Sequence, residues 1–253
     1  TNPTTNALEK KVMALEHAED AVITACGMAA ITNALLSNLK NGDHVICSDD
    51  TFMCTTSMFG DILPHRLGIE TSRVEILDVS NIEKEIRPNT KVIYLEALSN
   101  PQLKLADIPK IAEIAHAHGC KFIVDNTFPT PVNCRPIEWG ADIVTHSTTK
   151  YMDGHGVAVG GAIIDAGKFD WMAHADKYPG LCTPDESYHG VVYAKDFGLG
   201  GAFITKATAQ LMRDFGQRFA HDLRPISRIV PDQTGSCSFL IKLCSHQTSL
   251  IFI

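Results

Sequence analysis

A lysine follows a short β-branched strand, and small hydroxyl side chains lie beside it in the sequence. Residues 144–156 read VTHSTTKYMDGHG, and the lysine is Lys150. An ammonium group at the end of a buried strand is unfavourable unless it is paired or used covalently. A buried lysine amine can be a nucleophile that forms a Schiff base, and the hydroxyls of Ser147 and Thr149 could donate hydrogen bonds to a phosphate. A solvated lysine at the end of a surface strand is an equally good interpretation of this segment alone.

An aspartate ends a second apolar strand, 25 positions before Lys150. Residues 121–128 read KFIVDNTF, and Asp125 lies where the predicted strand ends, which is the end at which open α/β sheets bind ligands. The interval leaves room for one crossover between neighbouring strands. A lysine for a Schiff base and an aspartate for a pyridinium nitrogen are the two groups that pyridoxal 5'-phosphate (PLP) needs most. Taken by itself, Asp125 is better interpreted as a turn or helix-capping residue.

A glycine at a predicted strand-to-helix turn is the third chemical element. Residues 21–26 are an apolar segment, and Gly27 and Met28 open a helix predicted over residues 29–39. Glycine allows the backbone to approach a ligand closely, and the free N–H groups at a helix start bind phosphate. A single glycine at a helix start is common, so this signal is weak without the other two.

Strands and helices alternate from about residue 20 to residue 165, which predicts an open, mostly parallel α/β sheet with helices on both faces. The predicted strands are 44–47, 74–77, 91–96, 121–125, the segment that leads to Lys150, and 160–165. The predicted helices are 6–17, 29–39, 80–86, 108–118 and 205–213. Residues 166–216 are otherwise rich in loops, and residues 217–253 show no convincing period.

Composition excludes several other classes of protein. The chain has 253 residues and a net charge of −7, which argues against a nucleic-acid partner. No apolar run is long enough to span a membrane. The 8 cysteines have no metal-ligand spacing, so we expect no metal site and interpret them as reduced thiols of a cytoplasmic protein. An NAD-dependent oxidoreductase is a poor alternative because no GxGxxG segment follows a strand.

Taken together, the motifs of this chain resemble those of one enzyme family. The matching segments are Asn2-Pro3-Thr4, Leu8-Glu9, Cys26-Gly27-Met28-Ala29-Ala30-Ile31, Gly42-Asp43-His44-Val45, Tyr94-Leu95-Glu96, Asn100-Pro101, Val124-Asp125-Asn126-Thr127-Phe128, Ser147-Thr148-Thr149-Lys150-Tyr151 and Gly154-His155. They resemble the Cys/Met-metabolism PLP enzymes of fold type I. Within that family, Pro184 to Gly190 with Tyr193 and Phe197-Gly198 is most similar to the O-acetylhomoserine sulfhydrylases.

The resemblance implies roles around the ring of the cofactor. Lys150 would form the Schiff base with PLP and then move protons, and Asp125 would keep the pyridine nitrogen protonated. Asn100 would hydrogen-bond the 3′ oxygen, with Glu96 nearby. Phe52 matches the position of a ring-stacking tyrosine; it can stack but has no proton to give, which predicts slow elimination.

The phosphate and the substrate complete the implied site. Backbone N–H groups of Gly27 and Met28 and the hydroxyls of Ser147 and Thr149 would hold the phosphate. The implied reaction removes a proton from Cα and then from Cβ of an amino-acid substrate, expels acetate from Cγ of O-acetylhomoserine and adds sulfide, which gives homocysteine. A homodimer or homotetramer with sites at the subunit interfaces is expected.

Two parts of the family pattern are not recognisable. Residues 1–216 are expected to be the PLP-binding large domain, with an N-terminal arm missing or trimmed, so that a Tyr-x-Arg pair would lie upstream of Thr1. Residues 217–253 do not resemble the C-terminal domain, whose substrate-carboxylate arginine cannot be assigned to Arg218, Arg224 or Arg228. We expect this tail to be a truncated or frame-shifted product.

Alternative functions therefore stay open. One is a γ-lyase or a cystathionine synthase or lyase of the same family. The other is a catalytically impaired remnant of the PLP fold that acts only by binding other proteins, which the absent C-terminal domain favours.

Overall fold

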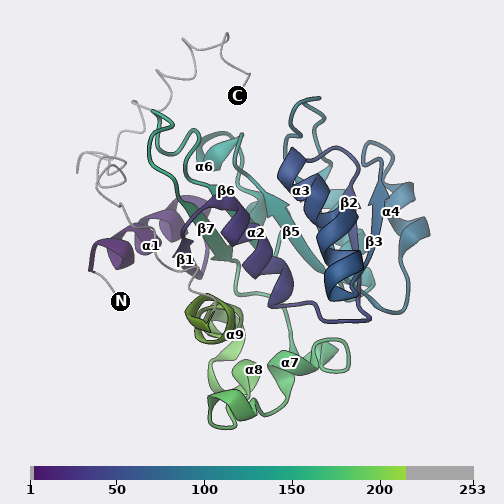
Figure 1. Ribbon diagram of the computed structural model, residues 1–253, viewed down its shortest axis with the longest axis vertical. Coiled ribbons are helices and arrows are strands. Elements are labelled where there is room, and N and C mark those ends of the chain that lie inside the picture. The colour runs from purple at the N-terminus through teal and green to yellow at the C-terminus, as the bar shows by residue number, and fades with distance from the viewer. Residues whose placement is uncertain (1–2, 215–253) are drawn as a thin grey trace.

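The computed structural model describes residues 3–214, and its centre is a seven-stranded sheet with the order β1-β7-β6-β5-β4-β2-β3 (Figure 1). The strands are β1 (Asp20–Thr24), β2 (His44–Ser48), β3 (Glu70–Val74), β4 (Thr90–Glu96), β5 (Lys121–Asp125), β6 (Ile143–Ser147) and β7 (Gly161–Asp165). Strand β7 is antiparallel to both of its neighbours, and the other pairs are parallel. The prediction of an open, mostly parallel sheet is confirmed.

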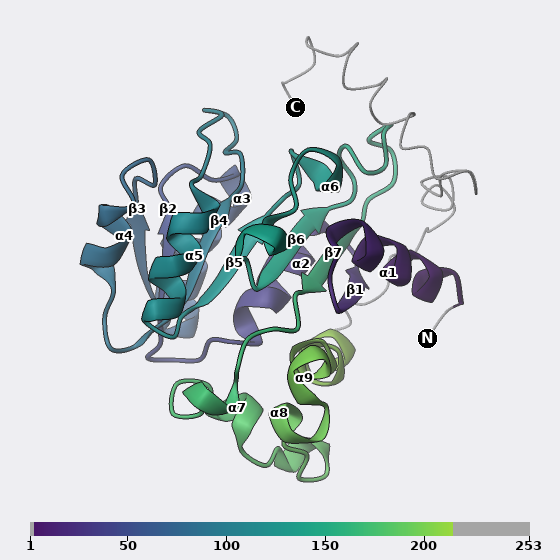
Figure 2. The same cartoon turned by 180° about the vertical axis from the view of Figure 1, so that it is seen from behind.

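Helices cover both faces of the sheet. The α-helices are α1 (Pro3–Glu16), α2 (Gly27–Leu36), α3 (Met53–Ser57), α4 (Ser80–Glu85), α5 (Ile108–Ala117), α6 (Thr130–Asn133), α7 (Pro179–Cys182), α8 (Tyr193–Asp196) and α9 (Gly198–Lys206). The π-helices are Met58–Arg66 and Ala207–Met212, and the short 3-10 helices are Pro136–Trp139, Met172–His174 and Glu186–Tyr188. Helices α2 and α3 lie on one face, and α1, α4, α5 and α6 lie on the other (Figures 1 and 2).

The period-two pattern of the strands gives each face its own core. On β5, Ile123 packs with the α2 face, whereas Val124 packs with the face that α1 and α5 cover. Asp125 comes one residue after Val124, so its side chain lies on the α2 face at the carboxyl end of the strand. The alternation therefore decides which helices can reach this carboxylate.

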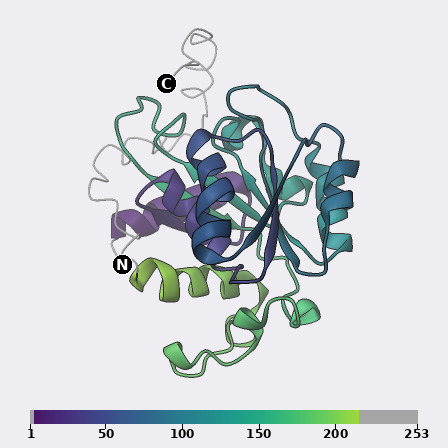
Figure 3. The same ribbon diagram turned by 45° about the vertical axis from the view of Figure 1, so that its right-hand side comes forward.

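Residues 166–214 form a helical extension at the end of the sheet where the parallel strands begin (Figure 3). Lys121, the first residue of β5, anchors it: its ammonium lies 4.4 Å from the ring centroid of Phe169 and 4.1 Å from that of Trp171. These cation–π contacts fix the extension far from the carboxyl ends of the strands. None of the described helices is long and apolar enough to cross a membrane.

Two predicted elements differ from the structure. The strand predicted at residues 74–77 is β3, Glu70–Val74, because this edge strand is half exposed and carries polar residues that do not give an apolar run. The helix predicted at residues 205–213 begins earlier, at Gly198. The first turn of α9 is rich in glycine, which has a low helix propensity, so the sequence did not indicate a helix there. The tail 217–253, including Arg218, Arg224 and Arg228, lies outside the described residues.

Candidate active site

Three neighbouring parallel strands bring polar side chains to one edge of the sheet. Glu96 ends β4, Asp125 ends β5 and Ser147 ends β6. Glu96 and Asp125 are register partners, and Asp125 is the register partner of Thr145. The expected single crossover between the strand of Asp125 and the strand before Lys150 is confirmed, because β5 and β6 are adjacent.

Asp125 is a buried carboxylate held by short-range hydrogen bonds. Its Oδ1 accepts from the backbone N–H of Thr127 at 2.9 Å, and its Oδ2 accepts from the hydroxyl of Thr145 at 3.2 Å. Burial raises the pKa of Asp125, and the hydrogen bonds from Thr127 act in the opposite direction. No lysine, arginine or histidine forms an ion pair with Asp125 in residues 3–214. A cationic nitrogen placed beside Asp125 would favour its charged form.

Glu96 is a second buried carboxylate beside the first. Its Oε1 accepts from the backbone N–H of Phe52 at 2.6 Å, and its Oε2 accepts from the backbone N–H of Asn100 at 3.1 Å. Burial and then the charge of Asp125 raise the pKa of Glu96 to about 8. The resemblance placed Glu96 near the ring without a role, and the structure shows that it joins two loops.

The start of α2 lies against Ser147. A Cβ added to Gly27 would lie 2.6 Å from Cβ and 3.0 Å from Oγ of Ser147, so only glycine allows this approach. The first turn of a helix presents unbonded N–H groups, and those of α2 start here, at Gly27 and Met28. The structure thus brings together the predicted glycine and the predicted serine in a place suited to an anion.

Lys150 and Thr149 occupy a turn beyond β6. Strand β6 ends at Ser147, and Lys150 is exposed in the turn that follows, so of the two interpretations of this segment the structure shows the exposed lysine and not the buried one. The turn carries the lysine out of the sheet, with the N–H of Lys150 donating to the carbonyl of Ser147 at 3.3 Å. The Thr149 hydroxyl exchanges hydrogen bonds with Gly160 at 3.2 and 3.0 Å, so it closes the loop that follows Lys150.

Phe52 and Asn100 lie in the loops after β2 and β4. Phe52 is the N-cap residue of α3 and its side chain is 37% exposed. Asn100 is half-buried and precedes Pro101. Both backbones reach Glu96, which places the two residues at the same edge of the sheet as Asp125.

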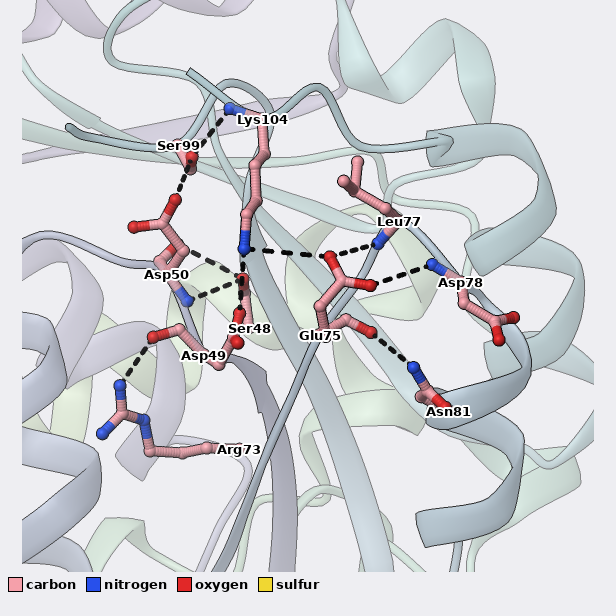
Figure 4. A network of polar contacts seen from close by, with 10 residues as sticks. All are labelled: Ser48, Asp49, Asp50, Arg73, Glu75, Leu77, Asp78, Asn81, Ser99 and Lys104. Atoms are coloured by element: carbon pink, nitrogen blue, oxygen red, sulfur yellow. Dashed lines mark hydrogen bonds and ion pairs between the residues drawn. The ribbon is translucent and has the colours of Figure 1, made fainter. Parts of the chain in front are cut away.

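Sequence reasoning missed the polar network that fastens these loops to each other (Figure 4). The Ser99 hydroxyl donates to Asp50 Oδ2 at 2.6 Å, and the Lys104 ammonium lies 3.7 Å from Asp49 and 3.8 Å from Glu75. The carboxylates come from the loops after β2 and β3, whereas Ser99 and Lys104 come from the loop after β4. Contacts between residues this far apart in the sequence leave no local sequence pattern. The two aspartates that directly follow a buried strand, Asp49 and Asp50, are the part of this network that the sequence does show.

Comparisons with known proteins agree with this geometry. The sequence model of the Cys/Met metabolism PLP-dependent enzymes matches residues 1–213. Homocysteine synthase of Schizosaccharomyces pombe is 42% identical over 217 residues, which cover 85% of this chain and 50% of that protein. O-acetyl-L-homoserine sulfhydrylase of Corynebacterium glutamicum is 42% identical over 220 residues, with the same shares of 85% and 50%. The chain spans about half the length of the curated relatives it matches.

A solved structure extends the similarity to the fold. A Campylobacter jejuni protein assigned as an O-acetylhomoserine (thiol)-lyase superposes with a TM-score of 0.82 and 35% sequence identity, over 90% of this chain and 55% of that one. That crystal structure contains N′-pyridoxyl-lysine-5′-monophosphate.

Proposed function

We propose that this chain, which belongs to the Cys/Met metabolism PLP-dependent enzyme family, is the cofactor-binding part of an enzyme that replaces the acetate of O-acetyl-L-homoserine with sulfide or a thiol. One observation carries the proposal: a glycine that opens α2 against Ser147 lies at the same sheet edge as Asp125, a buried carboxylate that forms no ion pair within residues 3–214. That combination suits a phosphorylated ring with a basic nitrogen. The relatives named above support the choice of substrate.

The residues present fit PLP. Asp125 would pair with the ring nitrogen, the N–H groups of Gly27 and Met28 with Ser147 would hold the phosphate, and the Lys150 amine would bond the aldehyde carbon. Phe52 and Asn100 would flank the ring. When bound, PLP supplies an electron sink that makes the Cα proton of an amino acid acidic.

The side chains of this chain would then do the remaining work. Asp125 would pair with the ring nitrogen and favour its protonated form, because a carboxylate stabilises a cation beside it. Lys150 lies on an exposed turn, so its amine can move and accept the Cα proton of the substrate. Phe52 would shield one face of the ring from water but has no proton to give at Cβ or at the leaving acetate. In the net reaction the Cγ–O bond breaks, acetate leaves and a Cγ–S bond forms.

Further parts of the proposal concern the whole protein. We infer a homodimer or homotetramer and a cytoplasmic location, in keeping with an amino-acid enzyme of this family. Thr149 belongs to the proposed phosphate site only if its hydroxyl exchanges Gly160 for the phosphate. Residues 1–216 remain the proposed large domain.

A spectroscopic titration tests the proposal. PLP is added to the purified chain, absorbance is scanned before and after borohydride, and the Lys150→Ala variant is measured in parallel. Lys168→Ala removes another exposed lysine, in the extension after β7, and serves as the matched control. We expect an absorbance band that borohydride traps in the wild type and the control only, followed by homocysteine formation from O-acetylhomoserine and sulfide. Absence of the band, or an equal band in Lys150→Ala, would overturn the proposed cofactor site.

A further inference from the structure

The carboxyl group of Glu96 connects two loops that are distant in the sequence. It accepts one backbone N–H from Phe52, 44 residues before it, and one from Asn100, 4 residues after it. Glu96 is 6% exposed, so the acceptor side of both bonds is shielded from water. The two loops hold the residues proposed to flank the cofactor ring, and the carboxyl group lies between them.

The same loops have a second brace that does not involve Glu96. The buried hydroxyl of Ser99 donates to Asp50 at 2.6 Å, and the backbone N–H of Lys104 donates to that hydroxyl at 2.9 Å. The N–H of Leu103 donates to the Ser99 carbonyl at 3.0 Å. The loops can therefore keep their fold when Glu96 is changed, and Glu96 acts on the placement of Phe52 and Asn100.

Neighbouring charges set the number of hydrogen bonds that Glu96 can accept. Asp125 on β5 and Asp50 after β2 both face it, as does Tyr94 on its own strand. Burial, then the charge of Asp125, raise the pKa of Glu96, so the neutral acid is favoured at neutral pH. A neutral acid has one strong acceptor oxygen for the two N–H donors, whereas a carboxylate has two. A cation beside Asp125 would favour the carboxylate and with it both bonds.

We propose that Glu96 is a positioning residue that holds Phe52 and Asn100 at the edge of the site, and that it holds them more firmly once a cationic ring nitrogen lies beside Asp125. Binding of the cofactor would thus order the two residues that contact its ring. The second half of this inference rests on the proposed function, whereas the first half concerns the chain alone.

Amide hydrogen exchange on the chain without cofactor tests the first half. Glu96→Ala removes both acceptors, and Glu96→Gln keeps one acceptor and the shape of the side chain. At a pH above the Glu96 pKa of about 8, where the wild type has a carboxylate, we expect exchange at Phe52 and Asn100 to accelerate roughly tenfold or more in Glu96→Ala, and at one of the two in Glu96→Gln. The amides of Leu103 and Lys104 should stay protected, because their brace is intact. Unchanged protection at Phe52 and Asn100 in both variants would overturn the inference.

Glu75→Gln is the matched control. The carboxylate of Glu75 also accepts two backbone N–H groups, from Leu77 at 2.9 Å and from Asp78 at 3.2 Å, but both belong to its own turn (Figure 4). Glu75 also lies 3.8 Å from the Lys104 ammonium, and glutamine removes this ion pair but leaves both acceptors of Glu96 in place, so exchange at Phe52 and Asn100 should not change. If it accelerates their exchange as much as Glu96→Gln does, the effect is a general loosening of the sheet edge and the inference is wrong.

The wild type provides a readout that a purely structural role would not give. Protection factors of Phe52 and Asn100 should rise as pH is raised through about 8, where Glu96 loses its proton. Added PLP should move this rise to lower pH. A flat profile without PLP contradicts the role of Glu96. A chain that shows the rise but binds no PLP contradicts the proposed function alone.

Discussion

Nε2 of His146 lies 2.5 Å from Oε1 of Glu16, and both side chains are completely buried. The same Glu16 oxygen accepts from the amide of Asn126 at 3.0 Å. His146 directly precedes Ser147, and Asn126 directly follows Asp125. One carboxylate of α1 therefore fixes, from the opposite face of the sheet, the chain positions next to both proposed cofactor residues.

Replacing Glu16 with alanine should destabilise the fold strongly. It leaves His146 and Asn126 buried without their shared acceptor, and removal of one partner from a buried pair typically lowers the free energy of unfolding by about 3–5 kcal/mol. Urea denaturation followed by circular dichroism measures this loss. Glu113→Ala, at an exposed position of α5, should change the free energy of unfolding by less than about 0.5 kcal/mol. Equal stability of the two variants would mean that the buried contact contributes nothing.

Much of this architecture could be predicted from the sequence because the central strands are continuous apolar runs. Strand β5 consists of buried residues that end in Asp125, and such a run has few other interpretations. Gly27 could also be singled out in the sequence. The reason that this position needs glycine is its contact with Ser147, 120 positions later, and only the fold shows that contact.

Other parts could not be predicted because they depend on neighbours distant in the sequence. The bond between Glu96 and the backbone of Phe52 gives no pattern, since any residue at position 52 has an N–H to donate. The exposure of Lys150 follows from a turn that begins three positions earlier. The two threonines in this turn favour strands, so the sequence did not indicate where the strand ends.

Gly27→Ala tests the close approach of α2 to Ser147. The added methyl would lie 2.6 Å from the Ser147 Cβ, so the helix or the strand must shift. Overpacking of this kind lowers the free energy of unfolding by about 1–3 kcal/mol, and we expect weaker PLP binding as well. Denaturation and a fluorescence titration with PLP measure the two effects.

Gly60→Ala is the control for that experiment. Nothing lies within 4 Å of a Cβ at Gly60, which belongs to the π-helix Met58–Arg66. Alanine should be neutral or stabilise this helix by up to about 1 kcal/mol. If Gly27→Ala behaves like Gly60→Ala in both measurements, α2 does not need its glycine to form the site.

His44 should contribute a loss of stability in mild acid. Its ring bonds Thr90 at 2.7 Å and Ser72 at 3.0 Å, and burial lowers its pKa from 6.5 to about 4. Between these two values the unfolded chain binds a proton that the folded chain does not, so the free energy of unfolding falls as pH falls from about 6.5 to about 4. Urea midpoints at pH 7.5 and pH 5, compared between the wild type and a variant without this ring, measure this contribution.

His44→Asn isolates the contribution of this ring from that of Asp165. Burial raises the pKa of Asp165 to about 6 and that of Glu96 to about 8, so proton uptake by these two groups stabilises the folded state as pH falls and opposes the effect of His44. The change in the free energy of unfolding from pH 7.5 to pH 5 should therefore be more favourable in the asparagine variant than in the wild type. An equal or larger loss in the variant would show that His44 does not cause the acid sensitivity.

Phe52→Tyr should accelerate the proposed reaction. The side chain is 37% exposed, so a phenolic hydroxyl can be added without burying an unpaired polar group. A positioned phenol can transfer the protons that phenylalanine cannot, and general acid–base catalysis of this kind contributes roughly a hundredfold or more. Homocysteine formation from O-acetylhomoserine and sulfide is compared between the wild type and the variant at equal PLP occupancy.

Phe197→Tyr, 43% exposed at the start of α9, should have the rate of the wild type. An unchanged rate in Phe52→Tyr would mean that Phe52 does not occupy the position of the proton-transferring ring, even if it contacts the cofactor.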